Sequence, residues 1–203
     1  MQRAMQVFLN LPDTAQPRGD DELLPLEHVV FTPPARQTLS RQLEVRGHWQ
    51  GGVLFGTAQA GILSVQVAGP LGPPTWNQQP LKPHLPYLLG WSDSLYAQFG
   101  ADLDWYGNWI AAPDGQMPDE RADLTWLAQG ARHGLFDARH PLVIVGFSNL
   151  TLSGRAYGWD EGQPMALECT FRVDAADAPE QPQRRTTPGV DGAARRSLTE
   201  VPF

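Results

Sequence analysis

Short apolar runs bounded by glycine, proline and polar residues recur along the chain, and they predict a series of β-strands. The clearest run, 142–147, is apolar except for one glycine, which is typical of a strand buried on both faces. The run 62–68 alternates in part between apolar and polar residues, so we expect it to pair antiparallel with 51–56. The full set of predicted strands is 28–31, 51–56, 62–68, 105–110, 142–147, 150–159 and 166–173.

Helical periodicity appears in three further segments. Residues 119–132 place leucines and alanines three and four positions apart, and Asp119 stands where an N-cap is expected. Residues 35–46 carry leucines four positions apart, and 91–99 show a shorter pattern of the same kind. Six prolines between 69 and 86 argue against a regular element there. The pattern predicts an α+β domain of the α/β/α type, a mixed sheet flanked by helices, over residues 28–173.

The ends of the chain differ in composition from this body. We interpret residues 1–27 as a lead-in: residues 1–12 contain a short apolar patch without the apolar core and cleavage site of a signal peptide, and 10–26 are polar and turn-rich. Residues 174–203 contain few large apolar residues, so we predict a disordered tail. Two arginine pairs in that tail, at 184–185 and 195–196, are candidate contacts for an acidic partner.

Charge and cysteine content exclude several classes of function. Fifteen basic against 22 acidic residues give a net charge of −7, which argues against nucleic-acid binding. No apolar run approaches the roughly 18 residues that span a bilayer, so we expect no membrane association and a cytoplasmic protein. The single cysteine, Cys169, lies in an apolar stretch and is predicted to be a buried, inert thiol.

Familiar catalytic and cofactor motifs are missing from the sequence. It contains no phosphate-binding loop, no dinucleotide fingerprint and no serine elbow, and the five histidines do not have the spacing of a metal pair. We therefore predict no cofactor and no metal. The glycine-rich segment 51–56 lacks the lysine of a phosphate loop, and we interpret its glycines as sites of close backbone packing at a strand start.

Two distant segments nevertheless carry one informative pattern of glycine, tryptophan, proline and aspartate. Residues 51–56 have two glycines, three apolar residues and a final glycine, and later Gly107, Trp109 and Pro113 are followed at a set spacing by Asp123. Together these segments resemble the JAMM/MPN (JAB) domain, a family of zinc-dependent isopeptidases. That family has the motif Glu-x-Gly-Gly and later Gly-x-Trp-His-x-His-Pro, serine and aspartate. The resemblance implies an MPN/JAB-like fold for the body of the chain.

At the positions that carry the family's chemistry, this chain departs from the pattern. The resemblance places the catalytic glutamate at Trp49, the two histidines at Ile110 and Ala112, the serine at Glu120 and the aspartate at Asp123. A hydrolytic zinc site needs about three protein ligands and an open position for water. Ile110 and Ala112 have no donor atoms, so we expect no zinc and no isopeptidase activity. For Asp123 itself, the start of a helix favours an aspartate through the helix dipole.

The resemblance then implies a catalytically inactive protein-interaction or scaffold module. Its partner would be an active MPN homologue or a ubiquitin-like protein, and a homodimer is also open. Seven tryptophans support an interface, since tryptophan is enriched at binding hot spots. The candidate binding surface comprises Trp76, Trp91, Trp105 and Trp109.

Two alternative functions remain open at this stage. One is an isopeptidase or peptidase with a relocated site, in which His48 or His84 lies within hydrogen-bond reach of Asp123 and Glu120. The other is a structural subunit of a phage-like or defence assembly, with the arginine-bearing tail as a docking arm.

Overall fold

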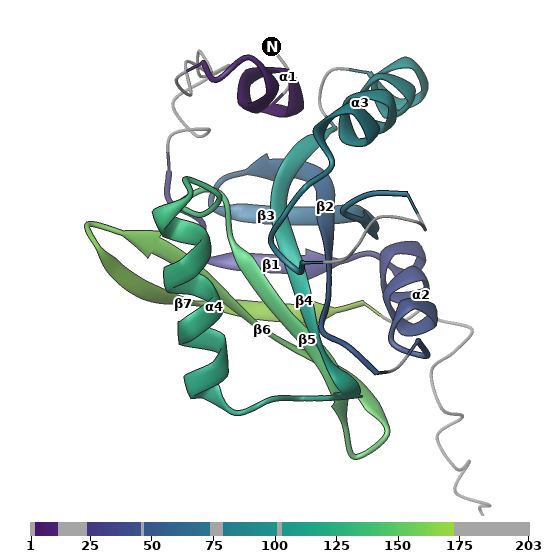
Figure 1. The fold of residues 1–203 in the computed structure, drawn as a ribbon, viewed down its shortest axis with the longest axis vertical. Coiled ribbons are helices and arrows are strands. Elements are labelled where there is room, and N and C mark those ends of the chain that lie inside the picture. The colour runs from purple at the N-terminus through teal and green to yellow at the C-terminus, as the bar shows by residue number, and fades with distance from the viewer. Residues whose placement is uncertain (1–2, 12–23, 46, 74–78, 101–102, 173–203) are drawn as a thin grey trace, which may run out of the picture.

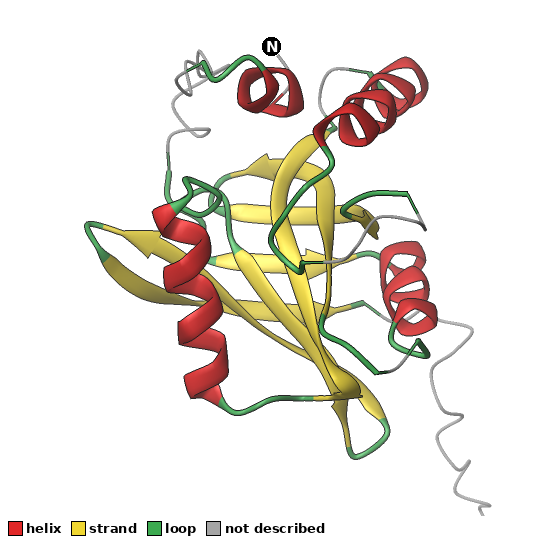
Figure 2. Cartoon of the chain, in the orientation of Figure 1, coloured by secondary structure: helices red, strands yellow, loops and turns green. Residues whose placement is uncertain are grey.

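The computed structural model describes residues 3–11, 24–45, 47–73, 79–100 and 103–172, which form seven strands and four helices (Figures 1 and 2). The predicted tail, 174–203, and most of the lead-in lie outside the described residues. The strands are β1 (His28–Phe31), β2 (Gln50–Gln59), β3 (Ile62–Pro70), β4 (Asp104–Gln116), β5 (Leu142–Ser148), β6 (Thr151–Asp160) and β7 (Gln163–Phe171). The helices are α1 (Arg3–Phe8), α2 (Pro33–Gln42), α3 (Leu85–Phe99) and α4 (Glu120–Arg132).

The strands form a closed barrel in the order β1-β3-β2-β4-β5-β6-β7. Closure depends on the short strand β1, which pairs in parallel with β3 on one side and with β7 on the other. The predicted α/β/α arrangement, an MPN/JAB-like mixed sheet flanked by helices, is therefore wrong, because the sheet closes into a barrel. The strands themselves were predicted, but the pairing of β1 with β7 joins residues about 140 positions apart, and local sequence patterns do not encode such pairings.

The barrel has one apolar core inside and a second one outside. Val143 and Val145 of β5 point into the barrel with Trp109, whereas Leu142 and Ile144 point outward beneath the helices. Both faces of β5 are thus buried, which explains its almost unbroken apolar run. The inner core also receives Leu39 and Leu43 from α2 and the residue after it, so this segment covers one end of the barrel (Figure 1).

The outer core lies beneath α1, α3 and α4 (Figure 1). Helix α4 connects the parallel strands β4 and β5, and its N-cap is as predicted: Asp119 Oδ1 accepts a hydrogen bond from the Ala122 amide at 2.8 Å. Several elements extend beyond their predicted bounds, and α3 and β4 do so by the most residues. Helix α3, predicted to begin at 91, begins at Leu85 because Pro86 is tolerated in its first turn, and β4, predicted to end at 110, continues as far as Gln116.

Helix α1 had not been predicted, and a buried arginine attaches it to the barrel. Arg3 is 7% exposed, and its Nη2 donates to the Leu135 carbonyl at 2.8 Å. Its guanidinium lies over the Trp105 ring at 4.6 Å, a cation–π contact. Helix α1 has six residues and begins with an arginine, a residue type that is mostly exposed. Its sequence therefore did not indicate a buried helix.

The prediction of close backbone packing at 51–56 is confirmed. A Cβ added to Gly51 would lie 2.0 Å from the Pro80 carbonyl oxygen, and one added to Gly52 would lie 2.0 Å from Trp109 Nε1. The two glycines therefore admit the 79–84 segment on the outer face of β2 and the indole on the inner face.

Two of the four tryptophans predicted to form a binding surface are instead core residues. Trp105 and Trp109 are each 1% exposed, and each indole N–H donates to a buried backbone carbonyl, Gly107 and Gly69 respectively. Trp91 is half-buried against Phe55, and Trp76 lies outside the described residues. In the part of the chain that is described, no helix combines the length and apolar composition required to cross a membrane.

Candidate functional site

The site predicted from the sequence centres on Asp123, which is fully buried on the inner side of α4. Its Oδ2 accepts hydrogen bonds from Arg155 Nε at 2.6 Å and from the Tyr157 hydroxyl at 2.9 Å. Both donors belong to β6, where alternate residues point to the same face. Arg155 also donates through Nη2 to the Pro118 carbonyl at 2.6 Å, which fixes the loop that leads into α4.

This arrangement gives Asp123 an internal cation. The hydrogen bond and charge of Asp123 raise the pKa of Arg155, so the guanidinium stays protonated. Burial, together with the hydrogen bond to Asp123, raises the pKa of Tyr157 to about 12, so its hydroxyl remains a donor. The predicted dipole role of Asp123 is therefore secondary, because its carboxylate turns inward to the barrel and forms a buried ion pair.

The free energy of unfolding is expected to fall as the pH rises from about 9 to about 12. Burial raises the pKa of Cys169 from 9.0 to about 12, and the pKa of Tyr157 rises from 10.0 to about 12. In this range the unfolded chain has released protons that the folded chain retains, so their stabilisation, complete below pH 9, is lost progressively. Urea unfolding at several pH values measures this dependence. In Cys169→Ala, the free energy of unfolding should begin to fall near pH 10 instead of pH 9. If its dependence on pH is the same as in the wild type, the raised pKa of Cys169 is wrong.

The other predicted site positions lie around the same part of the barrel. Gly51 pairs with Ile110, Ile110 with Ile144, and Ile144 with Arg155, so Ile110 belongs to the row of the sheet that ends at the ion pair. Ile110 is fully buried, and Ala112 is 7% exposed. Both therefore contribute apolar surface to the barrel wall.

Trp49 and Glu120 have different surroundings. Trp49 is half-buried, and its ring lies 5.3 Å from that of Trp126, which is one turn after Asp123 on α4. Glu120 is exposed as the first residue of α4, where a carboxylate complements the helix dipole. Of the predicted positions, Ile110 and Ala112 are thus buried and apolar and Trp49 is half-buried, whereas Glu120 is exposed to solvent. Across the described residues, no group of three or more His, Cys, Asp or Glu side chains is placed to bind a metal ion.

The relocated hydrolase required a histidine at Asp123 or Glu120. In the described part of the chain, the Asp123 carboxylate accepts hydrogen bonds only from Arg155 and Tyr157, and no histidine contacts it or the carboxylate of Glu120. His84 instead caps α3, where its Nδ1 accepts from the Tyr87 amide at 3.1 Å. His48 is exposed in the segment before β2. The hydrogen bonds on which the hydrolase hypothesis depended are therefore not formed.

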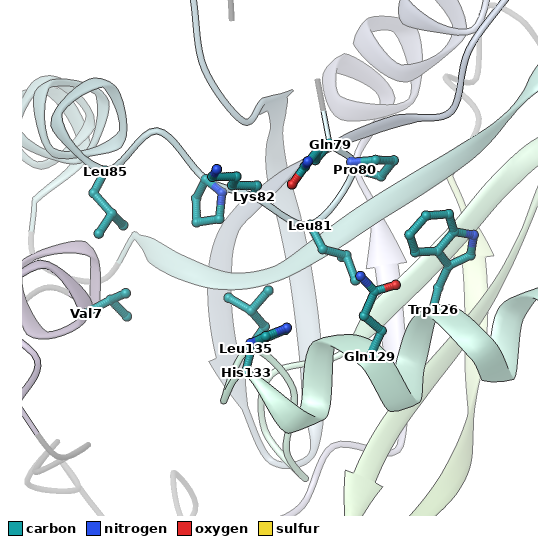
Figure 3. Close-up of a pocket in the computed structure, with 11 residues that line it drawn as sticks. Val7, Gln79, Pro80, Leu81, Lys82, Leu85, Trp126, Gln129, His133 and Leu135 are labelled. Carbon is teal, nitrogen blue, oxygen red and sulfur yellow. The ribbon is translucent and has the colours of Figure 1, made fainter. Parts of the chain in front are cut away.

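A pocket of about 650 Å³ lies beside this region, between the C-terminal half of α4, the 79–85 segment and α1 (Figure 3). Leu81 lies near its centre, Trp126 at one end, and Val7 and Leu85 at the other. The remaining apolar lining comes from Pro80, Pro83 and Leu135. A volume of this size is within the usual range of ligand pockets.

Four exposed polar side chains surround the apolar lining of the pocket. They are Gln79, Lys82, Gln129 and His133. Lys82 is the one lysine among the 15 basic residues of the sequence. The amides of the glutamines both donate and accept hydrogen bonds, and the ammonium of Lys82 adds positive charge. No sequence motif indicates this pocket, because its lining residues come from three separate segments of the chain.

The ion pair and the pocket are connected through α4. Asp123 fixes the first half of the helix to β6, and Trp126, one turn later, contacts Trp49 and lines the pocket. The helix that forms one wall of the pocket is therefore held rigidly against the barrel.

Comparisons with known proteins give a fold and no family. No protein-family sequence profile matches the chain, and no curated protein matches it. The fold is similar to the solution structure of protein DSY2949 from Desulfitobacterium hafniense, a target of the Northeast Structural Genomics Consortium. The TM-score is 0.51 at 13% identity, over 72% of this chain and 94% of that one. At this identity the likeness shows the fold alone.

Proposed function

We propose that this protein is a non-catalytic interaction module that holds a short apolar segment of a partner protein in the pocket beside α4. The observation that carries this proposal is the composition of the pocket: an apolar floor around Leu81 and Trp126 with a polar rim. A peptide presents apolar side chains together with backbone N–H and C=O groups. The amides of Gln79 and Gln129 are suited to pair with those backbone groups.

The charge of the rim indicates which peptides are favoured. Lys82 supplies a positive charge at the pocket of a chain whose net charge is −7. Acidic residues next to the apolar positions of the peptide would be attracted to it over about a Debye length. The expected ligand is thus an extended segment with two or three apolar residues flanked by Asp or Glu.

A displayed library of random heptapeptides tests the proposal with the full-length protein as bait. We expect enrichment of apolar sequences flanked by acidic residues. In Leu81→Arg, a long charged side chain in the centre of the pocket should abolish the enrichment. Leu124→Arg is the matched control, since Leu124 is 43% exposed on α4, the helix that forms one wall of the pocket, and does not itself line the pocket.

Charge reversal provides the second part of this test. Lys82→Glu should retain the preference for apolar residues and shift the flanking preference from acidic to basic. The proposal is wrong if no sequence is enriched above background, or if Leu81→Arg selects the same peptides as the wild type.

The partners suggested by the family resemblance, an active MPN homologue or a ubiquitin-like protein, remain predictions, as does the cytoplasmic location. The enriched peptide sequences can be compared with segments of such proteins. A role as a structural subunit of a larger assembly is compatible with the same pocket, but no observation in the described chain favours it.

A further inference from the structure

Three two-residue turns connect antiparallel strands of the barrel, and all three have positive φ at both central residues. They are Ala60–Gly61 between β2 and β3 (φ 49° and 75°), Asn149–Leu150 between β5 and β6 (50° and 64°), and Glu161–Gly162 between β6 and β7 (46° and 84°). Positive φ at both positions is the signature of a type I′ turn, for which glycine is strongly preferred at the second position.

Leu150 departs from that preference, and no contact compensates for it. A bulky side chain in the left-handed region is an outlier, because its Cβ crowds the backbone. The leucine side chain is also 95% exposed, more than any other large apolar side chain among the described residues. Its apolar surface therefore remains in water while its backbone is strained. Within the described chain, no packing contact of the side chain offsets these two unfavourable contributions to the free energy.

We propose that Leu150 is the anchor of a second contact site, which inserts into an apolar pocket of a different protein. The residues beside it, Ser148, Asn149 and Thr151, are exposed and uncharged, so the rim of that pocket is expected to be polar and neutral. A second copy of this chain is disfavoured as the occupant, because two molecules of charge −7 repel each other.

The position of Leu150 separates this site from the pocket beside α4. The β5–β6 turn lies at the lower end of the barrel in Figure 1, whereas α1, which contributes to the pocket, lies at the upper end. Two proteins bound at these two places would not compete for the same surface. The inference does not depend on the proposed function, since either site can exist without the other.

Leu150→Gly provides the first test, because it recreates the second position of the other two turns. If the leucine serves a partner and not the fold, the variant should be more stable, with the equilibrium constant for unfolding about fivefold lower. Leu150→Ala keeps a Cβ, so its free energy of unfolding should rise little. A lower midpoint of urea unfolding for Leu150→Gly would assign the side chain a structural role and overturn the proposal.

The second test identifies the partner in cells. A photo-cross-linking benzoylphenylalanine replaces Leu150 in the full-length protein, and a control places it at Glu161, in the exposed turn between β6 and β7. A protein cross-linked at position 150 and not at 161 is purified, and its affinity is measured for the wild type and for Leu150→Gly. We expect binding at least tenfold weaker for Leu150→Gly and unchanged for Leu81→Arg, which blocks only the other pocket.

Three outcomes would overturn the proposal. One is the absence of any protein cross-linked specifically at position 150. Another is a purified partner that binds the wild type and Leu150→Gly equally. The third is self-association of the wild type that Leu150→Gly abolishes, because it would show that a second copy of the chain is the occupant.

Discussion

Arg155→Met is expected to lower the free energy of unfolding by about 3–5 kcal/mol, the cost typical of removing one partner from a buried ion pair. Asp123 is fully buried, and without the guanidinium its Oδ2 would keep only the Tyr157 hydroxyl as a donor. The same substitution frees the Pro118 carbonyl, which Arg155 binds at the start of α4. Urea unfolding followed by tryptophan fluorescence measures the loss.

Removal of the Asp123 carboxylate should lower the free energy of unfolding by less. In Asp123→Asn, the guanidinium left behind is 29% exposed and can be solvated, so we expect a loss of about 1–3 kcal/mol. The double variant Asp123→Asn/Arg155→Met removes both charges, and its loss should be smaller than the sum of the two single losses. Arg121→Met is the control on the same helix: Arg121 is exposed, and the change should stay within about 0.5 kcal/mol.

Additive losses in this double-mutant cycle would contradict the assignment of a coupled ion pair. A loss below about 1 kcal/mol for Arg155→Met would show that the pair contributes little beyond a surface salt bridge.

Zinc affinity provides a separate measurement, because the resemblance to the isopeptidase family places a metal ligand at Asp123. The ion pair leads us to expect no zinc-dependent rise in the unfolding midpoint.

Gly52→Ala is expected to lower the free energy of unfolding by about 3 kcal/mol, at the upper end of the usual cost of overpacking. The added methyl carbon would lie 2.0 Å from both Trp109 Nε1 and the Gly69 carbonyl oxygen. These two atoms form a hydrogen bond of 3.0 Å in the barrel interior, and the methyl group would separate them. The indole N–H would then be buried without its acceptor, which adds to the steric cost.

The same substitution at Gly90 supplies a matched control of opposite sign. Gly90 lies in the interior of α3, and a Cβ added there meets nothing within 4 Å. Gly90→Ala should therefore raise the free energy of unfolding by about 0.5–1 kcal/mol through the difference in helix propensity. A loss below about 1 kcal/mol for Gly52→Ala would mean that the Trp109 ring can move aside, contrary to the tight packing described above.

The elements of this fold could largely be predicted from local patterns. The apolar run 142–147 indicated β5, the glycines at 51 and 52 indicated close packing at the start of β2, and Asp119 indicated the start of α4. The arrangement of those elements could not be predicted in this way. The expected sheet flanked by helices was wrong because of β1: the sequence of its four residues does not indicate the two parallel neighbours, β3 and β7, that close the barrel.

The candidate site shows the same division. Sequence spacing singled out Asp123, but its partners Arg155 and Tyr157 lie more than 30 residues away on β6, and only the outward-facing row of the sheet brings them to α4. Trp105 and Trp109 were assigned to a surface because aromatic composition alone does not distinguish a core from an interface. The pocket around Leu81 and Trp126 joins segments with no sequence relationship to one another.

The sequence by itself determined where the strands and three of the four helices lie, because hydrophobic period, caps and turn residues act over a few positions. It also determined that the chain carries a net charge of −7 and lacks the donor atoms of a hydrolytic zinc site at Ile110 and Ala112. The tertiary structure alone decided that the sheet closes and that Asp123 is neutralised by Arg155. It also decided that Leu150 is left in water on a strained turn. Each of these depends on contacts between residues distant in sequence, or on their absence, and such contacts are set by the packing of the whole chain.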